Sequence, residues 1–155
     1  MEFDSGLLQA LTEKTAAEIC KWAYDFPYNI YNFINQPNEY LLNRETWGTE
    51  QFCLIQDEKT VGYVSCQIED DCLWIGWSMN PKHCGKGDGH LFVLKCTEEI
   101  KKRFNYEGSL YLRVAASNQR AVKAYQKAGF VYQKQIQDEV AYSNHIENFW
   151  VMRLD

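Results

Sequence analysis

Three glycines at every second position lie between a predicted strand and a predicted helix. The strand covers 73–79 and is ended by an Asn-Pro pair, and 90–104 carries apolar residues at helical spacing. Glycine adopts positive φ and lets a ligand approach the backbone closely. The first N–H groups of a helix lack internal partners, and the helix dipole favours an anion there. The segment 84–90 (CGKGDGH) therefore predicts either a plain turn or a phosphate cradle.

The spacing of these glycines disfavours the usual nucleotide-binding motifs. The segment reads G-x-G-x-G, whereas the dinucleotide fingerprint reads G-x-G-x-x-G. No Gly-Lys-Ser/Thr sequence follows it, so the Walker pattern is absent from the sequence as well. A second motif is needed to choose between a turn and an anion site.

That second motif follows a predicted strand at 110–115. Asn118 (or Ser117) suits the N-cap of a short helix, and Gly129 suits the position after its C-terminus. Tyr125 falls near the same face of this helix as Asn118, so the cap and a phenol share one side. The segment indicates either an amphipathic helix with a buried tyrosine or a helix that presents a functional phenol.

In this order, the two motifs resemble those of the GNAT acetyltransferase superfamily. The family pattern Arg/Gln-x-x-Gly-x-Gly/Ala corresponds to 84–89, with cysteine at its first position. The later family motif corresponds to 118–130, which reads NQRAVKAYQKAGF. The resemblance covers 51–155, and the N-terminal third fits only loosely. Within that third, the pattern W-x-Y-x-x-P-Y-x-x-Y at 22–31 is similar to bacterial members of the superfamily.

The resemblance implies that the chain binds acetyl-coenzyme A and transfers its acetyl group. The glycine turn would hold the pyrophosphate, and 77–79 would pair with the pantetheine arm like an added strand. Tyr125 matches the family's general acid, and the backbone N–H of Met79 matches its oxyanion donor. The residues implied in coenzyme binding are Trp77, Ser78, Met79, Cys84, Gly85, Lys86, Gly87, Asp88, Gly89, His90, Asn118, Arg120, Tyr125 and Lys127.

Several of these assignments keep a second interpretation. The charges of Lys86, Arg120 and Lys127 are equally compatible with a solvated surface. In the aromatic segment, Tyr28 and Tyr31 are candidate contacts to the acceptor, or residues that pack the core. The sequence alone does not choose between these roles.

Two departures from the family pattern bear on the chemistry. Many relatives place a glutamate on the strand before the glycine turn, but 74–76 holds no carboxylate, so no general base is assigned. Cys84 replaces the family's Arg/Gln and removes one contact to phosphate. A helix N-terminus would also favour a nucleophilic thiolate at Cys84, although no His/Asn partner pattern supports it.

The whole pattern predicts an α+β fold: a GNAT-like mixed, mainly antiparallel sheet flanked by helices in a single domain, 1–155. The N-terminal part, 1–48, would form a helical acceptor-side segment, and 49–155 would form the coenzyme-binding core with a closing hairpin. The predicted helices are 12–24, 38–44, 90–104 and a short one after Asn118, and the predicted strands are 51–56, 60–68, 73–79, 109–115, 130–139 and 145–153.

Composition limits the class of partner. The net charge of −5 disfavours nucleic acid, whose phosphates require a basic surface. No run of about 20 apolar residues predicts a membrane span, and the N-terminus lacks the apolar stretch of a leader. The six cysteines form no C-x-x-C pair, so we expect free thiols, a cytoplasmic location and no metal site. The sequence leaves undecided whether the chain forms a homodimer.

Two classes of function follow from the resemblance. The first is an N-acetyltransferase that moves an acetyl group from acetyl-coenzyme A to a primary amine, on a small molecule or a protein N-terminus, by direct attack in a ternary complex. The second is a non-catalytic acyl-coenzyme A-binding or interaction module of the same fold. Tyr125 favours the first, whereas Cys84 and the missing carboxylate favour the second.

Overall fold

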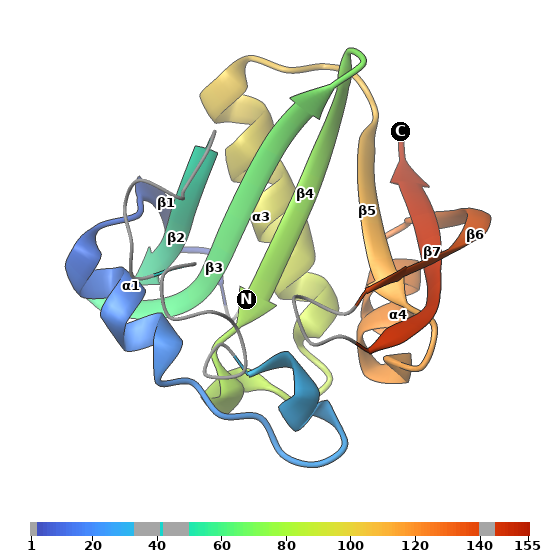
Figure 1. The fold of residues 1–155 in the computed structure, drawn as a ribbon. Helices are drawn as coiled ribbons and strands as arrows, with labels where there is room; N and C mark the ends of the chain where they lie inside the picture. The colour runs from blue at the N-terminus through green and yellow to red at the C-terminus, as the bar shows by residue number, and fades with distance from the viewer. Residues whose placement is uncertain (1–2, 33–40, 42–49, 140–144) are drawn as a thin grey trace.

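A computed structural model of the chain describes residues 3–32, 41, 50–139 and 145–155. These residues form one seven-stranded sheet with the order β1-β2-β3-β4-β5-β7-β6, covered by helices (Figure 1). The elements are β1 (Leu7–Ala10), α1 (Glu13–Cys20), η1 (Tyr28–Tyr31), β2 (Glu50–Gln56), β3 (Lys59–Glu69), β4 (Cys72–Met79), η4 (Pro81–His83), α3 (Gly89–Phe104), β5 (Leu110–Ala115), α4 (Gln119–Lys127), β6 (Val131–Glu139) and β7 (Ile146–Leu154). The α+β prediction is confirmed.

The N-terminal part differs from its prediction at two places. Strand β1 was not predicted, and it pairs with β2 from Leu7↔Ile55 onward. The predicted helix 12–24 is too long, because α1 ends at Cys20 and the Trp22 N–H bonds the Ile19 carbonyl in a tight final turn. The chain is thereby turned toward the end of β4. The predicted helix 38–44 lies outside the described residues, apart from Leu41.

Strands β4 and β5 are parallel, and they pair over only two residues. Leu73 faces Leu110 and Trp74 faces Tyr111, after which the two strands separate. β4 continues along β3 as far as Met79, and β5 continues along β7 as far as Ala115. Figure 1 shows the two strands close at one end and apart at the other, with α3 behind them. A gap therefore opens inside the sheet, between the carboxyl ends of two neighbouring strands.

The helices pack on both faces of the sheet. Successive residues of a strand point to opposite faces, so β2 serves two cores. Phe52 and Leu54 are buried together with Phe92 of α3. Cys53, which lies between them, is buried together with Ile19 of α1. Each face of the sheet is thus covered by its own helix.

Helix α4 is fixed at both ends by the caps that the sequence predicts. The Asn118 side chain accepts a hydrogen bond from the Ala121 N–H at 3.3 Å. At the other end, Gly129 has φ 104° and donates to the Gln126 carbonyl, and the Phe130 N–H donates to the Tyr125 carbonyl. This pair of bonds is the Schellman motif, which needs glycine at the left-handed position. The caps set the start of α4 beside the open gap.

Gly62→Ala tests the close approach of α3 to β3. An added Cβ would overlap the ring of Phe92, which is buried and cannot move aside freely. We expect the free energy of unfolding to fall by about 1–3 kcal/mol, measured by urea denaturation. In the control Gly76→Ala, the Cβ would meet only the Ser65 hydroxyl, at 2.8 Å, and that hydroxyl can rotate. An equal loss in both variants would contradict this packing.

Candidate active site

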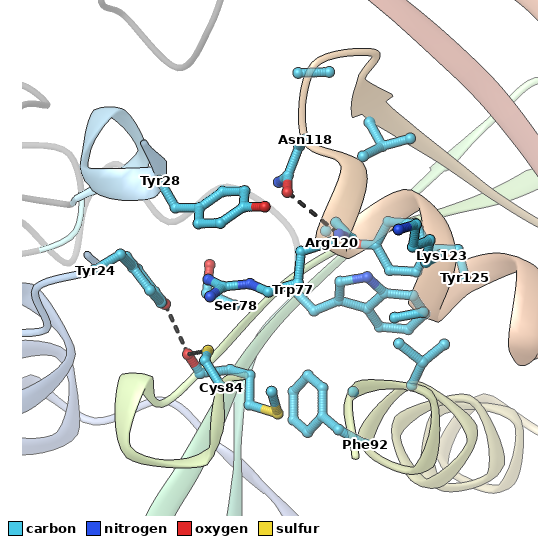
Figure 2. A pocket seen from close by; sticks show the side chains of 18 of the residues that line it. Tyr24, Tyr28, Trp77, Ser78, Cys84, Phe92, Asn118, Arg120, Lys123 and Tyr125 are labelled. Carbon is cyan, nitrogen blue, oxygen red and sulfur yellow. Dashed lines mark hydrogen bonds between the residues drawn. The ribbon is translucent and has the colours of Figure 1, made fainter. Parts of the chain in front are cut away.

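The gap between β4 and β5 is the inner end of a cleft of about 780 Å³. Its walls come from the end of β4, the glycine turn, the start of α4 and the ends of β5 and β6. Tyr24 and Tyr28 close it on the side of the N-terminal segment, as Figure 2 shows. Segments far apart in the sequence therefore meet at one cavity, and most of the predicted site residues belong to them.

Of the residues predicted to bind a coenzyme, all but Lys86 and Asp88 line this cleft. Lys86 is exposed and Asp88 is half-buried. Tyr28 also lines the cleft, as expected of a contact to the acceptor. Tyr31 ends η1, but its side chain lies outside the described part of the structure. The predicted residues that line the cleft are Tyr28, Trp77, Ser78, Met79, Cys84, Gly85, Gly87, Gly89, His90, Asn118, Arg120, Tyr125 and Lys127.

The register of β3 and β4 determines which backbone groups face the cleft. Met79 lies opposite Gly62, while the Asn80 N–H donates to the Val61 carbonyl at 2.9 Å. In an antiparallel ladder, this makes Met79 and Gly62 a non-hydrogen-bonded pair, so the Met79 N–H and C=O point away from β3. By the same alternation, the N–H of Trp77 points to the cleft. The register thus turns two backbone donors of the predicted segment 77–79 toward the cleft, those of Trp77 and Met79.

Tyr24 is the main contact that the sequence analysis did not assign. Its hydroxyl donates to the Met79 carbonyl at 2.8 Å, and its backbone N–H donates to the Asn32 side chain at 2.8 Å. Burial raises the pKa of Tyr24 far above its ordinary range, and the nearby Cys84 thiol adds to this effect. The phenol therefore stays protonated and acts as a fixed donor. The aromatic pattern at 22–31 was its only signal in the sequence.

The glycine turn has the shape that an anionic group requires. Gly85 and Gly87 have φ of 75° and 80°, and a Cβ on either would meet nothing within 4 Å. The turn therefore presents bare backbone to open space. The Asp88 side chain makes no capping bond at the start of α3. The Leu91 N–H already donates to the Asp88 carbonyl, so the amides that precede it at the start of α3 are the ones suited to a ligand, which fits a pyrophosphate.

Two predicted residues of the later motif lie at the inner end of the cleft. The ring centroid of Tyr125 is 5.8 Å from that of Trp77 and 6.1 Å from that of Phe130. The phenol thus lies beside the β4 edge that carries the free backbone donors. Asn118 uses its side-chain oxygen for the cap of α4, which leaves its amide nitrogen as the donor toward the cleft.

Cys84 has the opposite character to a nucleophile. Its sulfur lies 3.9 Å from the Met79 carbonyl oxygen and 3.8 Å from that of Asn80. Burial raises the pKa of the Cys84 thiol, and the opposing charge of Arg120 does not compensate. A nucleophile needs a lowered pKa, so the nucleophile hypothesis is not supported.

Charged residues from the far wall were also missed. Arg113 of β5 and Asp138 of β6 line the cleft and form an ion pair with each other. Glu139 lines it one residue further along β6. In the described part of the chain, Asp138 and Glu139 are the carboxylates of this wall. No local pattern in the sequence indicates them, because strand pairing alone brings β6 to the cleft.

The described residues contain no group of three or more His, Cys, Asp or Glu side chains arranged to hold a metal ion. They also contain no helix long and apolar enough to cross a membrane.

The fold and the cleft define a known class of protein. The family model described as Acetyltransferase (GNAT) family matches residues 16–130, so the chain belongs to this family of acyltransferases. Comparison with curated protein sequences gives no match.

Solved structures share the fold at low sequence identity. An aminoglycoside acetyltransferase in complex with coenzyme A matches at 16% identity and TM-score 0.76, over 97% of this chain and 94% of that one. A spermidine N-acetyltransferase from Vibrio cholerae, in complex with coenzyme A and spermine, matches at 18% identity and TM-score 0.73, over 97% of this chain and 95% of that one. A ribosomal-protein-S5-alanine acetyltransferase from Vibrio fischeri matches at 15% identity and TM-score 0.69, over 99% of this chain and 94% of that one.

Tyr24→Phe tests the bond that fixes the end of β4. Removal of the hydroxyl leaves the Met79 carbonyl without this donor, so the free energy of unfolding should fall by about 1 kcal/mol at neutral pH. Because the pKa of Tyr24 is raised on folding, only the unfolded chain loses this proton as the pH rises above about 10. The contribution is therefore complete below that pH and is lost above it.

Urea denaturation of both proteins at pH 7 and at several values above 10 measures this effect. The stability difference between wild type and Tyr24→Phe should shrink as the pH rises. Tyr132→Phe, on exposed β6, controls for the loss of a phenol. A difference that stays constant with pH would show that Tyr24 is not held as a neutral donor.

Proposed function

We propose that this chain is an N-acetyltransferase that moves an acetyl group from acetyl-coenzyme A to a primary amine. The amine attacks the thioester directly, while both substrates are bound. The observation that carries the proposal is the open edge of β4, which leads through the short helix η4 into the glycine turn and the uncapped start of α3. An extended arm that ends in a pyrophosphate is the ligand that suits such a surface.

The residues of the cleft suit the parts of the coenzyme in order. The backbone of Trp77 and Met79 would pair with the pantetheine arm, as an added strand would. Gly85, Gly87 and the first amides of α3 would hold the pyrophosphate. The coenzyme would supply the activated acetyl group, whose thioester carbonyl accepts the attack of the amine.

Three groups of the chain would then act on the reacting atoms. The Met79 N–H, or that of Trp77, would donate to the thioester oxygen as negative charge develops there. The phenol of Tyr125 would give its proton to the departing sulfur as a general acid. The attacking amine must also lose a proton, and we assign no side chain to that step.

The acceptor is proposed only as a primary amine, on a small molecule or at a protein N-terminus. The structural neighbours include acetyltransferases named for two small molecules, an aminoglycoside and spermidine, and one named for an alanine of a ribosomal protein. The carboxylates of β6 would lie toward the acceptor side of the cleft.

A second candidate is a module that binds acyl-coenzyme A without turnover. It is favoured by one observation: the β4 segment 74–76 carries no carboxylate that could accept the proton of the amine. Both candidates would bind acyl-coenzyme A, but only the transferase would turn it over, so the next experiment distinguishes them.

Tyr125→Phe should separate catalysis from binding. Loss of a general acid lowers turnover by about 100-fold or more, whereas coenzyme affinity should stay nearly unchanged because the ring packing on Trp77 is kept. Thiol release is measured over a panel that includes spermidine, an aminoglycoside and a peptide with a free N-terminal alanine. Tyr132→Phe is the control. Equal thiol release by wild type and Tyr125→Phe would remove the acid role.

Coenzyme A should raise the melting temperature of the protein, because a ligand that binds only the folded state stabilises it. At a concentration of about 100 Kd, the gain corresponds to roughly 2.7 kcal/mol. Thermal unfolding with and without coenzyme A measures it, and ATP serves as the control for unspecific phosphate binding. No shift at millimolar coenzyme A would mean that the chain is neither a transferase nor an acyl-coenzyme A module.

A further inference from the structure

We propose that Arg120 supplies the pyrophosphate-binding cation that position 84 lacks, and that Tyr28 is the positioning residue that holds it. The inference rests on the proposed use of coenzyme A. It changes the role of Tyr28, which the sequence analysis assigned to the acceptor or the core.

The side chains of Arg120 and Tyr28 are in contact with each other. The Arg120 guanidinium carbon lies 4.0 Å from the centroid of the Tyr28 ring, well inside the range of a cation–π interaction. Both residues line the cleft and are half-buried, and Figure 2 shows the ring of Tyr28 beside Arg120. Tyr28 comes from the N-terminal segment and Arg120 from the first turn of α4. The contact therefore spans the cleft and fixes a flexible side chain in one place.

Arg120 lies beside the glycine turn. Ala124 lies one helical turn after Arg120 on the same face of α4. A Cβ on Gly89, the first residue of α3, would lie 3.2 Å from the Ala124 Cβ. This face of α4 thus packs on the start of α3. Arg120 also acts on the Cys84 thiol, whose pKa its charge lowers against the larger effect of burial.

The charge of Arg120 is not balanced by a carboxylate of the described residues. Among the residues that the structure describes, Arg120 has no carboxylate partner, whereas Arg113 across the cleft is paired with Asp138. Position 84 offers only a half-buried thiol whose pKa is raised, and Lys86 is exposed outside the cleft. A half-buried guanidinium without a carboxylate is a ready partner for a phosphate, which it can bind through two parallel N–H bonds.

Tyr28 would contribute by reducing the freedom of the arginine. An arginine side chain has many rotamers, and a ring that already fixes it lowers the entropy lost when the phosphate binds. This role needs the face of the ring and does not need the hydroxyl. Tyr28→Phe should therefore keep it, and Tyr28→Leu should lose it.

The test measures binding by isothermal titration with coenzyme A, dephospho-coenzyme A and pantetheine. Arg120→Gln should lower the affinity for the first two by roughly tenfold or more, and to the same extent, because both carry the pyrophosphate. Its affinity for pantetheine should not change. Tyr28→Leu should lower the first two affinities about threefold or more, and Tyr28→Phe should not. Lys134→Gln, which removes an exposed charge from β6, is the control.

A rescue variant makes the assignment sharper. Adding Cys84→Arg to Arg120→Gln should restore much of the coenzyme affinity, because a cation then returns to the turn from the other side. The wild-type affinity should also fall with rising salt more steeply than that of Arg120→Gln, and this comparison needs no further variant. The melting temperature of each unliganded variant checks its folding.

The outcomes separate this inference from the proposed function. If wild-type protein binds no coenzyme A, the proposed function fails and the inference fails with it. If wild type binds and Arg120→Gln binds equally well, only the inference is overturned. A loss confined to coenzyme A would place Arg120 on the 3′-phosphate, and an equal loss with pantetheine would place it on the arm. Either result overturns the pyrophosphate assignment.

Discussion

The short pairing of β4 with β5 is the constraint on which the site depends. Two parallel strands that paired along their full length would use their backbone groups on each other and leave no gap. Here the pairing stops after Trp74↔Tyr111, while β3 and β7 continue to support the two diverging strands. The cost of unpaired strand edges is limited because each strand keeps its outer partner. The gap is therefore a stable part of the fold, and it carries the free donors that the proposed chemistry needs.

The corner between β4 and the glycine turn transmits this constraint to the anion site. The peptide after Met79 is held on both sides, since Tyr24 donates to its carbonyl and its N–H, that of Asn80, donates to Val61. The Asn80 side chain adds a bond to the Thr60 carbonyl and accepts the Lys82 N–H. With the corner fixed, the direction of the glycine turn relative to the strand edge is also fixed. Preorganisation of this kind lowers the entropy lost on binding.

The sequence predicted those features that arise from local chemistry. The glycine turn, the Asn118 cap and the Gly129 position each follow from a residue's own backbone preference, and the structure has all three. Long-range contacts escaped the prediction. The bond from Tyr24 to Met79 joins residues 55 positions apart, and no periodic pattern in the sequence indicates it. Strand β1 was missed because its four residues carry no clear alternation, and it is recognised only by its pairing with β2.

The distribution of charge explains how an acidic chain can suit a polyanionic ligand. The whole chain carries −5, but its cleft is lined by four cationic side chains and two carboxylates in the described residues. The carboxylates lie on β6, whereas three of the cations lie on α4, where Arg120 is close enough to the glycine turn to act on the Cys84 thiol. A cleft focuses the field of its own walls, so the local sign outweighs the total. The charges of the cleft are thus divided between α4, whose cations suit phosphates, and β6, where Glu139 is a second carboxylate next to the Arg113–Asp138 pair.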